Sequence, residues 1–256
     1  MAARALIVDG FDMSTIGLIV DNKLDGFEDG PDITWPSQQI PQRIDSIVTS
    51  SSPAYRDRTI TVRGTVLGAT RAEMQTNLDM IKWRLSPDEV LVRFAHDETR
   101  EYRARAKRTA VTPIAPALTQ RGFEVNIQFV CNDPRKYAIS DTVTAFTTAT
   151  AMALGTAPSH PVLRLTGGTN PIVIYKDSSA VEQGRMEFTW AGTWIDVDML
   201  NRTIIDNASA NQATTLTTGD FFTLDPRDSD YVTPAWPTLE VSGGGSGQAT
   251  YRKNYW

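Results

Sequence analysis

One segment in the middle of the chain alternates apolar and polar residues and then stops abruptly. The apolar members are Phe123, Val125, Ile127 and Phe129, a period of two that predicts a half-buried strand. Asn132-Asp133-Pro134 ends the strand, because proline donates no N–H and restricts the residue before it. From Ala138 to Pro161 the chain is mostly Ala, Thr and Ser. We therefore expect a domain boundary after Tyr137.

The two halves, of roughly 130 and 120 residues, are each long enough to bury a core. A single cysteine, Cys131, excludes an intrachain disulfide framework. Its place at the end of a strand favours a buried, inert thiol over a nucleophile. The apolar runs Ala5–Val8 and Ile16–Val20 are too short for a signal or membrane segment, so we expect a soluble chain made in a cytoplasm, with no membrane insertion.

The charge balance argues against nucleic-acid binding. The net charge is −5 and the pI is about 5.1, and no long Lys/Arg run occurs. The basic clusters are Arg56-Asp57-Arg58 and the stretch from Arg100 to Arg108. The second places its charges on alternate positions, which favours a solvated strand face over a phosphate-binding ridge.

The first half predicts strands around one helix. Thr59–Leu67 alternates as a strand. Thr70 is a candidate N-cap with Glu73 as its capping-box partner, and Ser86-Pro87 ends the helix. Its apolar stripe comprises Met74, Leu78, Ile81 and Leu85.

The second half predicts only strands, spaced by about ten residues with turn residues between them, as in a β-sandwich or jelly roll. The expected strands are 161–168, 172–175, 185–190, 194–198, 203–206, 221–224, 239–241 and 249–256. A fold class that is mainly β with one helix follows for the whole chain.

No catalytic, cofactor or metal site is predicted. His96 and His160 are isolated, which leaves zinc without a ligand cluster. The loop from Asp225 to Asp230 lacks the glycine and glutamate of an EF-hand, so a solvated turn is favoured over calcium. The chain contains neither a nucleophile elbow nor a phosphate-binding loop.

Two features leave carbohydrate chemistry open. Asp196 and Asp198 share one strand face, as a glycosidase pair could. Trp194 and Trp236 are candidates for stacking on sugar rings, whereas Trp190 alternates with Phe188 and Met186 as a core residue does.

The order of several motifs resembles the distal tail proteins of long, non-contractile-tailed phages. The motifs are Val8–Asp12 with Ile16–Leu18, Tyr55–Gly64, the helix ending at Pro87, Phe129–Tyr137, Leu154–Pro158 with Pro161–Leu163, Gly192–Asp196 and Gly219–Leu224. Pro226-Arg227 stands where that family usually has a Pro-Gly turn.

The resemblance implies a structural virion protein at the phage tail tip, without enzymatic activity or cofactor. Residues 1–137 would be a tail-tube-like β-barrel or sandwich that forms a hexameric ring, 138–160 a linker, and 161–256 a galectin-like β-sandwich. Expected partners are further copies of the chain, the tail-tube protein, and the tail hub, fibre or tape-measure-associated protein. In some relatives the second domain docks receptor-binding proteins or carbohydrate.

We assign candidate roles accordingly. The ring interface would use the exposed cations Arg103, Arg105 and Lys107, because closed rings need heterologous interfaces. The interdomain hinge would comprise Asp133, Pro134 and Tyr137. Three alternatives stay open: a carbohydrate-binding adhesion module with Trp194 and Trp236, a glycan hydrolase using Asp196 or Asp198, and the tail-tube subunit itself.

Overall fold

The structure is a computed structural model that describes residues 5–26, 33–34, 37–39, 46–48, 54–94, 97, 99–113, 122–226 and 236–255. The chain divides into two compact units, Met1–Tyr137 with Trp256, and Ala138–Tyr255. The mainly-β fold class is confirmed, and α1 is the one α-helix within these described ranges.

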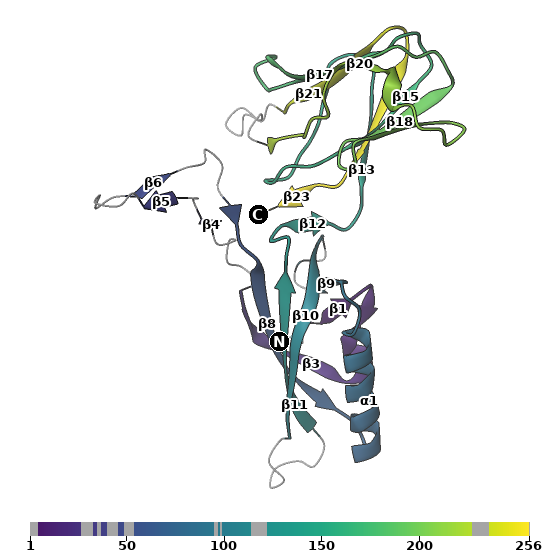
Figure 1. Cartoon of the computed structure of the whole chain (residues 1–256). Helices are drawn as coiled ribbons and strands as arrows, with labels where there is room; N and C mark the ends of the chain where they lie inside the picture. Colours follow the sequence, from purple (N-terminus) through teal and green to yellow (C-terminus); the bar gives the residue numbers. More distant parts are fainter. Residues whose placement is uncertain are drawn as a thin grey trace. The chain divides into compact units, whose positions relative to one another are not determined.

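The first unit is built on one long sheet with the strand order β2-β1-β9-β10-β11-β8-β3 (Figure 1). The elements are β1 (Leu6–Val8), β2 (Phe11–Asp12), the 3-10 helix η1 (Met13–Ile16), β3 (Leu18–Asp25), β8 (Arg58–Leu67), α1 (Arg71–Arg84), β9 (Val90–Phe94), β10 (Arg100–Pro113) and β11 (Gly122–Cys131). Two small pairs join β4 (Ile33–Thr34) with β7 (Ala54–Tyr55) and β5 (Ser37–Gln39) with β6 (Ser46–Val48). β12 (Lys136–Ala138) pairs with β10 at the end of the unit.

β10 belongs to both halves of this sheet. It pairs with β9 through Tyr102–Ala104 and with β11 from Arg105 to Pro113. The register with β11 shifts between Ala106 and Arg108, and such a bulge bends a strand and increases its twist. β10 can therefore pair with β9 near its start and with β11 along the rest of its length, so that both pairings enclose one common core.

The predicted alternation of β8 and β11 is confirmed. Ile60, Val62, Val125, Ile127 and Phe129 are buried in the core. The polar residues between them face outward, with Thr61 opposite Gln128 and Arg63 opposite Asn126.

The predicted helix is also confirmed. The Thr70 hydroxyl accepts a hydrogen bond from the Glu73 N–H (3.1 Å), and the stripe Met74, Leu78, Ile81 and Leu85 is buried. The Glu73 carboxylate accepts from the N–H of Ala69 (2.7 Å) rather than that of Thr70, so the cap reaches one residue further back than a standard capping box.

The second unit is a β-sandwich of two five-stranded antiparallel sheets, ordered β13-β22-β15-β18-β19 and β14-β21-β16-β17-β20, with its core between them. The strands of these sheets are β13 (Thr142–Phe146), β14 (Thr150–Ala151), β15 (Val162–Thr166), β16 (Ile172–Lys176), β17 (Glu182–Phe188), β18 (Trp194–Asp198), β19 (Thr203–Asp206), β20 (Leu216–Gly219), β21 (Thr238–Ser242) and β22 (Ser246–Tyr251). The short strand β23 (Asn254–Tyr255) belongs to neither sheet. A short 3-10 helix, η2 (Ala213–Thr215), precedes β20.

Two expectations for this half need correction. The supposed linker 138–160 contains β13 and β14, which pair with β22 and β21, because threonine favours strands even where few apolar residues mark them. The expected strand 221–224 makes only an isolated bridge from Leu224 to Ser159, although Phe222 and Leu224 are buried. The strand at this place is the Thr-rich β20.

Two turns of the second unit share one seven-residue pattern that the sequence analysis did not identify. The Asp177 carboxylate accepts from the N–H groups of residues two and four positions on and from the amide of Gln183. The Asp206 carboxylate makes the same three bonds, ending at Gln212. The fourth residue of each turn, Ala180 or Ser209, has φ near +60°. These bonds hold the pKa values of both aspartates below their usual range.

Candidate assembly surfaces

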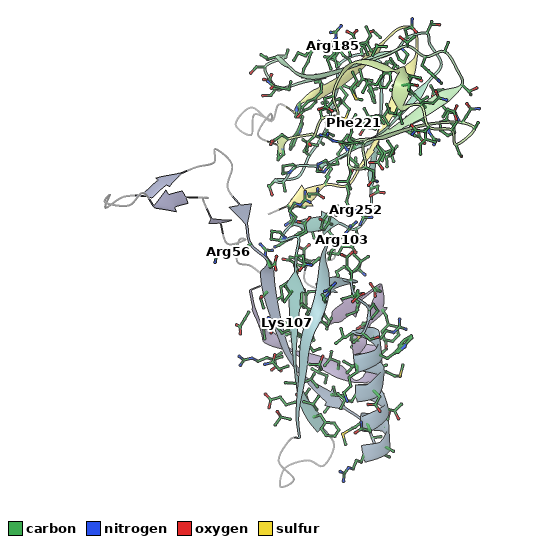
Figure 2. The ribbon with its side chains drawn as sticks, viewed as in Figure 1. Arg56, Arg103, Lys107, Arg185, Phe221 and Arg252 are labelled. Carbon is green, nitrogen blue, oxygen red and sulfur yellow. The ribbon has the colours of Figure 1, made fainter. Side chains whose placement is uncertain are left out.

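The three predicted interface cations are exposed residues of β10. Arg103, Arg105 and Lys107 are exposed, and Ala104, between the first two, is buried. Arg103 and Lys107 are labelled in Figure 2. Period two in an extended strand places Arg103 and Arg105 on the same side. Lys107 falls at the bulge between Ala106 and Arg108, beyond the residues of β10 that pair with β9. The predicted solvated strand face is confirmed for Arg103, Arg105 and Lys107, whereas Glu101, in the same alternation, is buried.

A cleft of about 220 Å³ brings two of these cations together with two of the predicted hinge residues. It is lined by Asp88, Glu89, Arg103, Ala104, Arg105, Val130, Asn132, Asp133 and Tyr137. The Nε of Arg105 donates to the backbone carbonyl of Asp88 (2.9 Å), which fixes that side chain at the rim. Lys107 and Pro134 do not line the cleft.

The Asp133 carboxylate organises the turn after β11. It accepts hydrogen bonds from the Arg135 backbone N–H (3.1 Å), from Arg135 Nε (2.8 Å) and Nη2, and from the Tyr137 hydroxyl. Burial alone would disfavour the charged carboxylate, but these bonds outweigh it and hold the pKa of Asp133 below its ordinary value. Pro134, between them, is buried.

Tyr137 connects this turn to the cationic face. Its side chain is buried, and the guanidinium carbon of Arg103 lies 4.9 Å from its ring centroid. Burial, together with the bond to Asp133, raises the pKa of Tyr137 to about 12. The phenol therefore stays a hydrogen-bond donor at neutral pH.

A buried arginine beside this turn was missed by the sequence analysis. Arg58 is only 5% exposed, and its Nη1 donates to the hydroxyl of Tyr102 (3.1 Å). The supposed basic cluster is thus divided, since Arg56 is exposed and Arg58 is not (Figure 2). The signal was present, because Arg58 falls in phase with the buried Ile60 and Val62.

Cys131 is opposite Arg58 in the register of β8 and β11 and is fully buried. Burial raises the pKa of its thiol to about 12, although the charge of Arg58 acts in the other direction. The expectation of a buried, packed thiol is confirmed.

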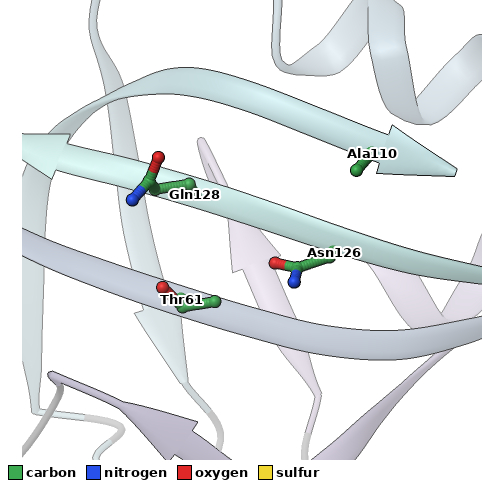
Figure 3. Close-up of a pocket in the computed structure, with 4 residues that line it drawn as sticks. All are labelled: Thr61, Ala110, Asn126 and Gln128. Carbon is green, nitrogen blue, oxygen red and sulfur yellow. The ribbon is translucent and has the colours of Figure 1, made fainter.

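The outward face of β8, β11 and β10 combines uncharged polar residues with the exposed charges of Arg63, Arg105 and Glu124. A hollow of about 290 Å³ on it is lined by Thr61, Ala110, Asn126 and Gln128 (Figure 3). The nearby charged pair, Arg63 and Asp25, is neutralised by a contact of 3.7 Å.

In the second unit, one candidate tryptophan lies on a strand and the other lies outside the sheets. Trp194 is on β18, and the guanidinium carbon of Arg164 lies 4.3 Å from its ring centroid. Trp236 precedes β21 and packs against the core of the unit. They therefore do not form one stacking platform.

The two candidate glycosidase carboxylates are engaged in structural contacts. Asp196 accepts two hydrogen bonds from Arg164, at 2.8 and 2.7 Å. Asp198 accepts from the N–H groups of Leu200 and Asn201 (both 2.9 Å) and caps the turn after β18. As expected, Trp190, Phe188 and Met186 are core residues.

Metal and membrane features are absent from the part of the chain that the structure describes. No group of three or more His, Cys, Asp or Glu side chains is clustered there. His160 is within that part, whereas His96, Asp228 and Asp230 lie outside it. No described helix is long and apolar enough to cross a membrane.

Scans against protein-family models and curated protein sequences find no match. Solved structures do share the fold. The SPP1 Dit (gp 19.1) protein, described as a paradigm of the hub adsorption apparatus in phages infecting Gram-positive hosts, matches with a TM-score of 0.80 at 17% identity over 100% of both chains. Chains of the phage P2 baseplate in its activated conformation match with TM-scores of 0.54 with Ca (9% identity, 98% of both chains) and 0.50 with Sr (10% identity, 98% of this chain and 99% of that one). The chain thus has, over its whole length, the fold of a phage distal tail protein.

Proposed function

We propose that the chain is a structural protein of a phage tail tip, where six copies form a ring that connects the tail tube to the hub, fibre or receptor-binding apparatus. The observation that carries the proposal is the fold match to SPP1 Dit, which spans both units in their order along the chain. A shared fold does not by itself determine function, so the surfaces of the chain must supply the rest of the argument.

The first unit offers the surfaces that a ring requires. β3 and β2 end the path of its main sheet, and an uncovered strand edge in a soluble protein invites pairing with another chain. The exposed cations Arg103, Arg105 and Lys107 suit a heterologous contact, in which each copy presents one surface to the next copy's different surface.

The hollow among β8, β11 and β10 is the candidate lining of the channel. Its lining residues, Thr61, Ala110, Asn126 and Gln128, offer a hydroxyl and amides, and the nearby Arg63 is paired with Asp25. Such a surface attracts water without holding a passing polyanion, because phosphate binding depends on unpaired Lys and Arg.

The Asp133 turn is the candidate hinge, held in one conformation where the chain leaves the first unit. Its bonds to Arg135 and Tyr137 restrain the backbone, and proline fixes its own φ. In this proposal the second unit is an outward domain that meets a partner protein.

A carbohydrate-binding module is the alternative. Its best remaining residue is Trp194, but the Arg164 guanidinium already covers a face of the indole on which a sugar would stack. The contact of Trp236 with the core removes the second stacking residue. The ring is therefore the preferred function.

Electron microscopy and mass photometry of the purified chain test this proposal. We expect closed six-fold particles with a central hole, whereas long tubes would indicate a tail-tube subunit. The double variant Arg103→Glu, Arg105→Glu should leave monomers, and Arg71→Glu, an exposed charge reversal on α1, should assemble normally. Rings that persist in the double variant would exclude the β10 interface, and monomers of the unaltered chain even when tail tubes are added as template would overturn the ring.

A further inference from the structure

The C-terminal end of α1 carries an arginine held by aromatic rings and without an ionic partner. The guanidinium carbon of Arg84 lies 4.2 Å from the ring centroid of Phe11 and 5.0 Å from that of Trp83. No hydrogen bond or ion pair between residues in the described ranges involves its side chain, and its Nε is buried without a partner.

Apolar side chains surround this cation at the surface. Trp83 is 65% exposed and Met80 is 37% exposed, and they are three positions apart on the helix, so they share a face. Exposed tryptophan and arginine are the residue types most enriched at binding hot spots, and methionine adapts to irregular partners. We call Phe11, Met80, Trp83 and Arg84 the α1 patch.

The chemistry of the patch selects a carboxylate. A guanidinium offers a planar fork of donors that matches a carboxylate in two parallel hydrogen bonds. The neighbouring rings exclude water and lower the local dielectric, which strengthens a charge pair. The partner group should therefore be Asp or Glu, with an apolar neighbour that covers Trp83.

A nucleic acid fits the patch poorly. Phosphate polymers are bound by several cations at once, and the chain carries a net charge of −5. The next exposed cation on the helix, Lys82, already contacts Asp79 at 3.5 Å. A single unpaired guanidinium beside a tryptophan suits one acidic side chain of a protein.

We propose that the α1 patch is a docking surface for an acidic segment of a second protein, which places a carboxylate on Arg84 and an apolar side chain on Trp83. The patch is separate from the β10 cations assigned to the ring. The inference rests on the proposed function only in expecting this second protein among the tail components.

Photo-cross-linking in infected cells tests the docking. With p-benzoylphenylalanine in place of Trp83, we expect a light-dependent product with a second protein, and at Gln75, an exposed position on the same helix, no such product. Mass spectrometry should place the cross-linked residue within a few residues of an Asp or Glu. Arg84→Gln should lower the yield at least tenfold, and Arg84→Lys should retain part of it.

Exchanging the charges of Arg84 and the partner's carboxylate tests more directly whether these two groups form a pair. Arg84→Glu should abolish the product, and changing the partner's acidic residue next to the cross-link to arginine should restore it. Four results would overturn the proposal: no product above that at Gln75, a product only with copies of this chain, a product with nucleic acid, or a yield unaffected by Arg84→Gln. Thermal unfolding of each variant would check that the chain still folds. Rings imaged from the same cells report on the proposed function separately, since a ring without the cross-link contradicts only the docking.

Discussion

The hydroxyl of Tyr137 donates a hydrogen bond to the carboxylate of Asp133, four residues earlier, and closes the turn that follows the longest buried strand pair of the first unit. The same carboxylate binds Arg135 through its backbone and its guanidinium. Three residues that the sequence presents as a simple break in a strand thus form one hydrogen-bonded cluster.

Removing the charge at Asp133 should weaken the first unit. Asp133→Asn should lower the free energy of unfolding by about 1.5–3 kcal/mol, the usual range for hydrogen bonds to a charged group. Urea denaturation measures the change. Asp21→Asn, at an exposed position, is the matched control and should have an effect within about 0.5 kcal/mol. Equal effects of the two variants would contradict a structural role for the cluster.

The contribution of Asp133 should depend on pH. Its folded-state pKa lies below the unfolded value near 4, so its stabilisation is complete above that value and is lost as pH falls through the folded pKa. The gap in unfolding free energy between the unaltered chain and Asp133→Asn should therefore be constant at about pH 5–8 and should narrow below about pH 4. A gap that widens in acid would show that another group is responsible.

Cys131 should react only when the protein opens. Burial raises its pKa to about 12, so neither thiolate nor access is available in the folded state at neutral pH. Iodoacetamide should label it at a rate that rises with added urea, followed by intact mass. A cysteine at the exposed position Ser14 should react at once under the same conditions. Rapid labelling of Cys131 without urea would refute the packing role.

A side chain at position 64 should destabilise the first unit. A Cβ there would lie 2.5 Å from the backbone oxygen of Ile19, so β3 would have to move away from β8. Gly64→Ala should cost about 1–3 kcal/mol in unfolding free energy, the range for overpacking in a well-packed region. Thr65→Ala, at the adjacent outward position, should cost less than about 1 kcal/mol. Calorimetry that ranks the two variants the other way would exclude this close strand contact.

The two tryptophans of the second unit should respond differently to truncation. Trp236→Ala removes a side chain packed on the core and should destabilise the whole chain by about 2–4 kcal/mol. Trp194→Ala on the outward side of β18 should cost at most about 1 kcal/mol. Trp194→Ala is therefore the variant to compare with the unaltered chain on glycan arrays, because a loss of binding by Trp236→Ala could reflect its lower stability. Specific glycan binding by the unaltered chain that Trp194→Ala abolishes would favour the carbohydrate-binding alternative.

Local patterns in the sequence were sufficient for the elements whose signals are local. Alternation predicted β8 and β11, and the Thr70 cap with its apolar stripe predicted α1. The same patterns did not predict the strands that are recognised only by their pairing with another strand. β13, β14 and β20 each contain threonine and are only two to five residues long, and their partners lie far away in the sequence. The repeated Asp-to-Gln turn spacing was visible in the sequence, but only the hydrogen bonds gave it meaning.

Local patterns were enough to predict a mainly-β chain with one helix, the strand break at Pro134, the buried Cys131 and the exposed cations of β10. The contacts between these groups follow from the three-dimensional fold. Arg103 lies on the ring of Tyr137, Arg58 is buried against Tyr102, and Arg84 lies beside Trp83 with no ionic partner among the described residues. The reason is physical: alternation fixes the side of a strand on which a residue lies, whereas strand order and register fix its neighbours, and these depend on contacts between distant segments.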